Sequence, residues 1–136
     1  MIEFRLLDKN EIDQNWPILV VMLNKVLKHT HGEETELSVK EAIVNEDISV
    51  ILLWDNNVII GFFTINPCKN ILYIPHVYIN NGKSKEYLNL INNKAEEIGK
   101  ILNCNIIRVY SDRIGMGRRI RPLGWKVGYI EYVKEI

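Results

Sequence analysis

The sequence lacks several features that define whole classes of proteins. Its 136 residues carry 17 Lys and Arg against 17 Asp and Glu, so the formal net charge is zero, which argues against general adhesion to nucleic acid or membranes. Its two cysteines, Cys68 and Cys104, are far apart and form no CxxC pair, which argues against a disulfide framework or a zinc knuckle. No apolar run approaches the roughly 20 residues of a membrane span. The first residues lack a signal-peptide profile, so we expect a cytoplasmic protein.

What remains is the composition of a compact folded domain. Hydrophobic residues make up 47% of the chain and charged residues 25%, which is enough apolar material for one sizeable core and too much for a disordered chain. We find no linker, internal repeat or low-complexity tract. The sequence therefore predicts a single domain spanning residues 1–136.

The N-terminal part predicts one strand and two helices. Ile2–Leu7 is predicted to be a strand, and apolar residues at gaps of three and four between Ile12 and Leu27 predict a helix. Pro17 is expected in the first turn of that helix, where its missing N–H costs nothing. Ser38 and Glu41 have the spacing of a capping box, which predicts the start of a second, short helix.

A three-stranded meander is predicted next. Ser49–Trp54 and Val58–Ile65 are rich in β-branched and aromatic residues, and the turn formers Asp55–Asn57 separate them, as in a hairpin. Ile71–Ile79 is expected to form the third strand. Pro75 lies within it and cannot donate a ladder hydrogen bond, so the strand should contain a bulge or an unpaired edge.

The C-terminal part predicts two further strands. A polar loop, Asn80–Ser84, precedes the strongest helical pattern of the chain, Tyr87–Leu102. The strand Ile106–Tyr110, a short helix over Met116–Leu123 and a closing strand over Lys126–Lys134 follow. The predicted order is βααβββαβαβ, an α/β (α+β) fold with a mixed, mostly antiparallel sheet of about six strands and helices on both faces.

The long helix joins its two flanking strands by a crossover, which favours a parallel pair. A parallel pair in which one strand carries a proline bulge is expected to part, leaving the main-chain groups of Val77 and Tyr78 open to a ligand. The loop before the long helix presents free N–H groups and the positive end of the helix dipole, so it suits a phosphate.

This order of elements, together with the final segment RIRPLGWKVGYIEY, resembles the GNAT-type N-acetyltransferases over essentially the whole chain. Leu123-Gly124-Trp125 stands where a Leu-Gly-Phe is usual in that family. The chain looks most like compact GNAT-like proteins encoded by tailed bacteriophages, some of which are associated with virions. The resemblance implies transfer of an acetyl group from acetyl-CoA to an amine on a small molecule or a protein.

The resemblance also implies where the pyrophosphate of acetyl-CoA would lie. The family's loop, Gln/Arg-x-x-Gly-x-Gly/Ala, aligns with residues 79–84, where Gly82 matches and Ile79 replaces the first residue. Ser84 replaces the last small residue and is expected to cap the helix and donate to a phosphate. Asn81 and Lys83 complete the candidate loop, with Lys83 adding positive charge.

The candidate catalytic residues are His76 and Tyr110. His76 lies beside the expected parting of the strands, where an imidazole can take the amine proton directly or through water. The alternative is a histidine half-buried at a bulge. The family's general acid, a tyrosine, aligns with Ile120, which cannot transfer a proton, and Tyr110 or Tyr129 would have to replace it.

A polar loop between the first two helices has ligand chemistry without a ligand spacing. His29, His31, Glu33, Glu34 and Glu36 match no closed metal site, and no cysteine joins them, so we predict no metal. In the family this loop often lines the acceptor side. Its acidic residues would favour a cationic acceptor.

An arginine cluster covers the segment 108–121. Its members are Arg108, Arg113, Arg118, Arg119 and Arg121. Three readings stay open beside a plain solvated helix face: a clamp for the CoA 3′-phosphate, for which Arg119 is the candidate, a nucleic-acid contact, or a docking surface for other phage proteins. Between Arg113 and Arg121 no aromatic residue interleaves with the arginines, which argues against stacking on single-stranded nucleic acid.

Two functions follow from these observations. The first is an acyl-CoA-dependent N-acyltransferase that uses acetyl-CoA. The second is a catalytically degenerate GNAT-fold phage protein that acts as a virion or protein-interaction component, which the incomplete loop, the missing tyrosine and the arginine cluster motivate. Binding of acetyl-CoA separates them.

Overall fold

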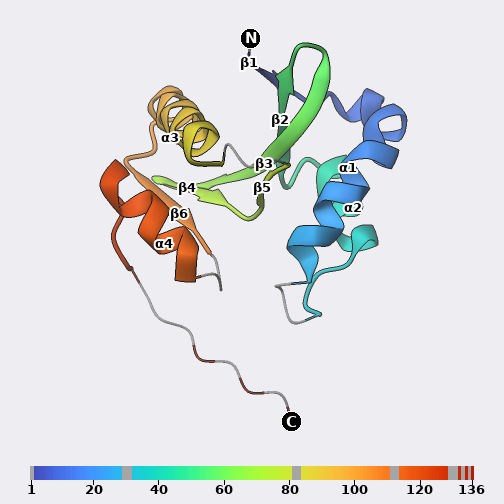
Figure 1. The fold of residues 1–136 in the computed structure, drawn as a ribbon. Coiled ribbons are helices and arrows are strands. Elements are labelled where there is room, and N and C mark those ends of the chain that lie inside the picture. The colour runs from blue at the N-terminus through green and yellow to red at the C-terminus, as the bar shows by residue number, and fades with distance from the viewer. Residues whose placement is uncertain are drawn as a thin grey trace.

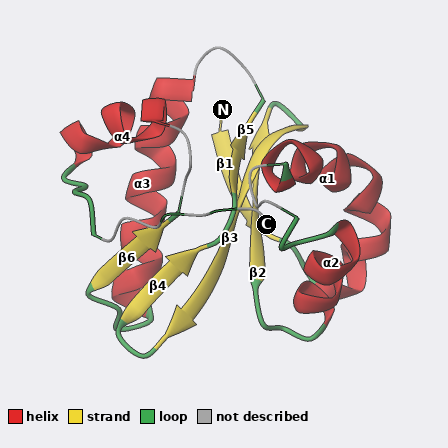
Figure 2. Cartoon of the chain, turned by 90° about the horizontal axis from the view of Figure 1, so that it is seen from below, coloured by secondary structure: helices red, strands yellow, loops and turns green. Residues whose placement is uncertain are grey.

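The computed structural model describes residues 2–28, 32–80, 84–110 and 114–128 and the single residues 132, 134 and 136. A central sheet separates two groups of helices (Figures 1 and 2). In chain order the elements are β1 (Ile2–Leu6), α1 (Ile12–Leu27), α2 (Glu36–Val44), β2 (Ser49–Asp55), β3 (Val58–Cys68), β4 (Ile71–Ile74), β5 (Val77–Ile79), α3 (Ser84–Ile101), β6 (Ile106–Val109) and α4 (Ile114–Ile120). No described helix is long and apolar enough to cross a membrane.

The sheet is mixed and mostly antiparallel, as predicted. The described residues form six strands. Five of them follow the order β1-β2-β3-β4-β6, and the sixth, β5, pairs with β3 on the same side as β4. β4 and β6 form the parallel pair, which the crossover through α3 requires. The chain leaves the sheet at the end of β5, passes through α3 and returns in β6, which lies beside β4.

Both faces of the sheet are covered, which explains the long apolar runs of β2 and β3. Val50 and Leu52 pack with α1 and α2 in one core cluster. Their neighbours Ile51 and Leu53 point to the other face and pack with residues of α3 in a second cluster. The two clusters fix the sheet between α1 and α2 on one side and α3 on the other.

α2 begins one turn earlier than the predicted Ser38 cap. Thr35 is the N-cap: its hydroxyl accepts the Ser38 N–H (3.1 Å), and its own N–H donates to Ser38 Oγ (2.9 Å). Ser38 thus takes the place that Glu41 was expected to hold in the capping box. Thr35-x-x-Ser38 and Ser38-x-x-Glu41 share the same spacing, and the structure selects the first.

Two further expectations are corrected. α1 begins at Ile12, so Pro17 lies inside the helix and not in its first turn, which deprives the Asp13 carbonyl of its usual helical donor. The six strands arise because the expected third strand divides into β4 and β5. Of the expected closing strand 126–134, the described residues 126–128, 132 and 134 are not in a strand.

Candidate functional site

The division between β4 and β5 is a β-bulge. β3 pairs with β4 up to Asn66 and Tyr73, and with β5 from Phe63 and Val77 onward. The two residues of β3 between these pairs therefore lie opposite three residues, Ile74–His76. The extra residue accompanies Pro75, which cannot donate to the ladder.

At this bulge the sheet opens. β4 pairs with β6 as far as Ile74 and Val109, but β5 pairs with β3 and not with β6. The strand edge of β5 that faces away from β3 is consequently unpaired within the described residues. The strands thus part at Pro75, as the sequence predicts.

The register determines which main-chain groups face the opening. The Thr64 N–H donates to the His76 carbonyl (2.9 Å), and antiparallel ladders alternate between residues that face the partner and residues that face away. Tyr78, two residues after His76, therefore directs its main-chain groups toward β3. Val77 and Ile79 direct theirs toward the open edge.

An apolar groove lies on the α3 side of the opening. It is open to the outside, has a volume of about 30 Å³ and is lined by Ile74, Val77, Leu88, Ile91, Asn92, Ala95, Val109, Ile120, Leu123 and Trp125. Trp125 Nε1–H donates to Asn92 Oδ1 (2.8 Å). This bond ties the segment after α4 to α3 and holds the groove narrow.

The groove contains Ile120 but not Tyr110. Ile120, which the sequence comparison aligns with the family's tyrosine, is half-buried and lines the groove together with Val77. Tyr110 directly follows Val109, and it is 64% exposed and does not line the groove. Tyr129 lies outside the described residues.

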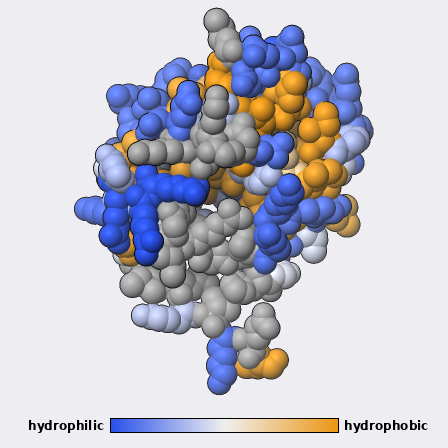
Figure 3. All heavy atoms as spheres, in the orientation of Figure 1, coloured by the Kyte–Doolittle hydropathy of each residue, from blue (hydrophilic) through white to orange (hydrophobic). Residues whose placement is uncertain are grey.

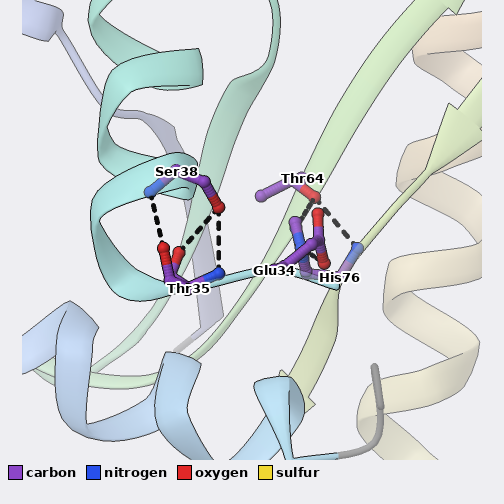
Figure 4. Close-up of polar contacts among 5 residues, drawn as sticks. All are labelled: Glu34, Thr35, Ser38, Thr64 and His76. Atoms are coloured by element: carbon purple, nitrogen blue, oxygen red, sulfur yellow. Dashed lines mark hydrogen bonds and ion pairs between the residues drawn. The ribbon is translucent and has the colours of Figure 1, made fainter. Parts of the chain in front are cut away.

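His76 lies in the bulge and is buried, with 2% of its surface exposed. Its Nδ1 is 2.8 Å from Thr64 Oγ1, and its main-chain N–H donates to the same oxygen (3.0 Å). Its Nε2 is 2.9 Å from Glu34 Oε2. Figure 4 shows the imidazole between the two side chains, which come from β3 and from the loop before α2.

One arrangement of protons satisfies every group in this network. The Thr64 hydroxyl donates to Nδ1 and accepts the His76 main-chain N–H, and Nε2–H donates to the Glu34 carboxylate. The Glu34 side chain is 38% exposed, whereas that of His76 is 1% exposed. Glu34 is therefore the solvent-accessible end of the network, and the buried His76 is linked to solvent only through its hydrogen bond to Glu34.

Glu34 was predicted only as one member of an acidic loop. Its position follows from its neighbour Thr35, whose capping box with Ser38 fixes the chain immediately before α2 (Figure 4). The hydrogen bond from His76 Nε2 is the second contact that fixes Glu34. The pairing joins residues 42 positions apart, and no local pattern in the sequence indicates it.

α1 also reaches β5 on this face of the sheet. Lys25 Nζ donates to Tyr78 Oη (3.2 Å), and Tyr78 donates to Asn80 Oδ1 (3.2 Å). Lys25 Nζ additionally lies 5.5 Å from the centre of the Tyr78 ring. The Tyr78 side chain therefore packs away from the groove, between β5 and α1.

The remaining predicted site residues are placed only in part. Asn81, Gly82 and Lys83 lie outside the described residues, and Ser84 is the first residue of α3. Arg119 is exposed on α4 and contacts another group of the protein. Figure 3 shows strongly hydrophilic side chains gathered over α4.

The sequence also predicts an acidic loop between α1 and α2 without a metal, and an arginine cluster around α4. Among the described residues no group of three His, Cys, Asp or Glu side chains could hold a metal ion. His29 and His31 lie outside the part of the chain that the structure describes, and so does Arg113.

Comparison with known proteins places the fold. No protein-family model matches the sequence, and no curated protein matches it. Among solved structures, one named "probable acetyltransferase" aligns with a TM-score of 0.73 at 12% identity, covering 98% of this chain and 97% of its own. PaiA N-acetyltransferase from Thermoplasma acidophilum, in complex with coenzyme A, aligns at 0.66 and 19%, covering 91% and 88%.

A third structure, the aminoglycoside N-acetyltransferase AAC(6')-Iy in complex with CoA, aligns with a TM-score of 0.69 at 13% identity. The match covers 100% of this chain and 96% of that one. Agreement over nearly the full length of both chains extends to the mixed sheet and the helices on its two faces. The chain therefore has the GNAT acetyltransferase fold.

Proposed function

We propose that the protein is an N-acetyltransferase that uses acetyl-CoA as the acyl donor and an amine as the acceptor. The observation that carries this proposal is that β5 parts from β6 at Pro75. The resulting opening in the sheet lies between the apolar groove beside α3 and the Glu34 carboxylate on the other side. The donor approaches from the α3 and α4 side. The acceptor approaches from the side of α1 and α2.

The donor side combines apolar walls with free main-chain donors. The pantetheine arm of acetyl-CoA is an extended chain with amide groups, and it suits the unpaired edge of β5. The Val77 N–H faces that edge and is positioned to donate to the thioester oxygen, where negative charge develops during attack. The main-chain groups of Tyr78 face β3, and this pairing holds β5 in the sheet.

The groove must widen to admit that arm. A groove volume of about 30 Å³ is room for about one water molecule. Widening requires α4 and Trp125 to move away from α3, which breaks the hydrogen bond to Asn92. Binding of the donor is thus coupled to the position of α4.

The phosphates of the donor belong near the start of α3. In the sequence, Asn81, Gly82, Lys83 and the first helical residue Ser84 come soon after β5, so an arm lying along β5 would carry the pyrophosphate toward the start of α3. Arg119 on α4 is the candidate partner of the 3′-phosphate.

The reaction is a direct transfer. The acceptor arrives as an ammonium ion and gives one proton to the Glu34 carboxylate, which the His76 imidazole holds by a hydrogen bond. The resulting amine attacks the thioester carbonyl, forming a C–N bond and a tetrahedral intermediate. The C–S bond then breaks, and the second amine proton passes to the CoA thiolate, with Tyr110 or water as the carrier. The products are an amide and CoA.

The similar structures support an amine acceptor without identifying it. AAC(6')-Iy is described in complex with a bisubstrate analogue, CoA-S-monomethyl-acetylneamine, at a TM-score of 0.66 and 12% identity. That compound joins an amine acceptor to CoA. For this chain we propose a small-molecule or protein amine.

A thermal-shift titration with acetyl-CoA tests the proposal. We expect the melting temperature to rise with acetyl-CoA concentration, because a ligand that binds only the folded state stabilises it by mass action. The variant Arg119→Ala should reduce the rise if Arg119 holds the 3′-phosphate. Release of free CoA thiol upon addition of an amine then measures transfer.

No shift at millimolar acetyl-CoA would contradict the proposal. It would favour the other function that the sequence raises, a protein-interaction component without catalysis. If acetyl-CoA raises the melting temperature but no amine releases free thiol, the protein binds the donor without transferring the acetyl group, and the proposed transfer would be contradicted.

A further inference from the structure

We propose that Glu34 is the residue that binds the cationic nitrogen of the acceptor, and that His76 and Thr64 hold its carboxylate in place for that purpose. This inference rests on the proposed function and adds to it the class of acceptor, a positively charged aliphatic amine. It also assigns His76 as a positioning residue that acts through Glu34.

The burial of the three residues gives a direction to the network. Thr64 is 1% exposed and His76 2% exposed, so neither can contact an acceptor without a rearrangement of the sheet. The Glu34 side chain, at 38% exposed, is the member of the network that a ligand can reach.

The carboxylate has binding capacity to spare. His76 Nε2 occupies one position on Oε2, and Oε1 has no partner among the described residues. An ionised carboxylate accepts about four hydrogen bonds. An ammonium group with three donors can therefore bind Glu34 while the bond to His76 remains, and such charge-assisted bonds are the stronger kind.

The charges around Glu34 also favour a cation. Glu33 is exposed beside it, and Glu36 accepts a hydrogen bond from the neutral side chain of Asn24 (2.6 Å). Of the lysines placed on this side, Lys25 is directed at the Tyr78 ring and hydroxyl, and Lys40 pairs with Asp13 (3.0 Å). Lys28, exposed at the end of α1, is one positive charge against the three carboxylates of Glu33, Glu34 and Glu36. The loop thus presents net negative charge on the side from which the acceptor approaches.

A purely structural role for the Glu34–His76 bond makes a different prediction. If the bond only pins the loop to the sheet, then Glu34→Gln should leave ligand binding unchanged, because the amide oxygen of glutamine still accepts from Nε2–H. If the carboxylate binds a cation, the same substitution removes the charge that the ligand needs. Glu33→Gln removes an equal charge one residue away and is the matched control.

Isothermal titration with spermidine in low salt, without acetyl-CoA, decides between the two. We expect the wild-type chain and Glu33→Gln to bind spermidine with dissociation constants within about twofold of each other, and Glu34→Gln to bind roughly tenfold or more weakly. Equal binding by all three proteins, equal weakening by both variants, or no binding by the wild-type chain would overturn the proposal.

The positioning role of His76 needs its own readout. His76→Gln retains an amide N–H that can donate to Glu34, whereas His76→Leu does not. We expect spermidine binding to be weakened by His76→Leu to the level of Glu34→Gln and partly restored in His76→Gln. Circular dichroism verifies that each variant is folded, and if both are unfolded the pair at Glu34 and Glu33 still decides the proposal.

The two proposals fail in distinguishable ways. Glu34-dependent spermidine binding without any thermal shift by acetyl-CoA would leave the cation site standing and remove the acyl transfer. A shift by acetyl-CoA with spermidine binding that does not depend on Glu34 would do the reverse.

Discussion

The Thr64 hydroxyl accepts the His76 main-chain N–H (3.0 Å) and also contacts the imidazole Nδ1 (2.8 Å). A single oxygen thus satisfies the backbone donor that the bulge displaces from the ladder and orients the ring that faces Glu34. This connects the local irregularity of the sheet to the proposed acceptor site.

The first prediction concerns that hydroxyl. Thr64→Val keeps the shape of the side chain but leaves two buried His76 groups without a partner, so the free energy of unfolding should fall by about 1–3 kcal/mol. Spermidine binding should weaken in the same variant, because the imidazole is no longer oriented. Urea unfolding and titration measure the two effects. Thr64→Ser retains the oxygen and is expected to behave more like the wild-type chain in both.

A second prediction concerns the close approach of β3 and β5. A Cβ at Gly61 would collide with the Tyr78 carbonyl oxygen, so Gly61→Ala should lower the free energy of unfolding by about 1–3 kcal/mol. Gly99 is the matched control, since its Cβ would meet its nearest atom at 3.6 Å, an ordinary contact. Thermal unfolding that ranks the two variants equally would contradict the role of Gly61.

The third prediction tests the groove as the donor site. Ile120→Trp should fill the groove and weaken acetyl-CoA binding by roughly tenfold or more. Ile101→Trp places the same side chain at a residue of α3 that is 71% exposed and outside the groove. We expect the control to bind acetyl-CoA like the wild-type chain. Equal affinity of both variants would place the donor elsewhere.

A fourth prediction addresses the capping box. Thr35→Ala removes the N-cap of α2 and should lower the free energy of unfolding by about 1 kcal/mol. It should also weaken spermidine binding, because the chain that carries Glu34 loses one of its two supports. Thr35→Ser retains a capping hydroxyl and should preserve both properties. A Thr35→Ala variant that is destabilised yet binds spermidine normally would show that the capping box does not position Glu34.

The sequence predicts most of the sheet because its strands and turns are determined by residues that are close together in the sequence. The hairpin around Asp55–Asn57 and the bulge at Pro75 follow from residues that lie next to one another. The parting of the strands then follows from the crossover and the proline together. The hairpin and the bulge depend on residues adjacent in the sequence, and the crossover depends only on the order of the strands and α3.

The features that the sequence does not predict depend on register or on distant contacts. Two capping boxes fit the sequence before α2, and the choice of Thr35 over Ser38 decides where Glu34 lies. The direction of the Tyr78 main chain depends on which residues of β3 face it. The Glu34–His76 contact forms only when the loop before α2 folds across the bulge.

The most direct test of the account is an amide NMR titration with acetyl-CoA. The account predicts that the largest chemical-shift changes occur at Val77 and Ile79, on the open edge of β5, and at Val109, where β6 leaves β4. It predicts small changes at Glu3 on the far edge of the sheet. Saturable binding that leaves Val77, Ile79 and Val109 unperturbed, or no binding at millimolar acetyl-CoA, would contradict it.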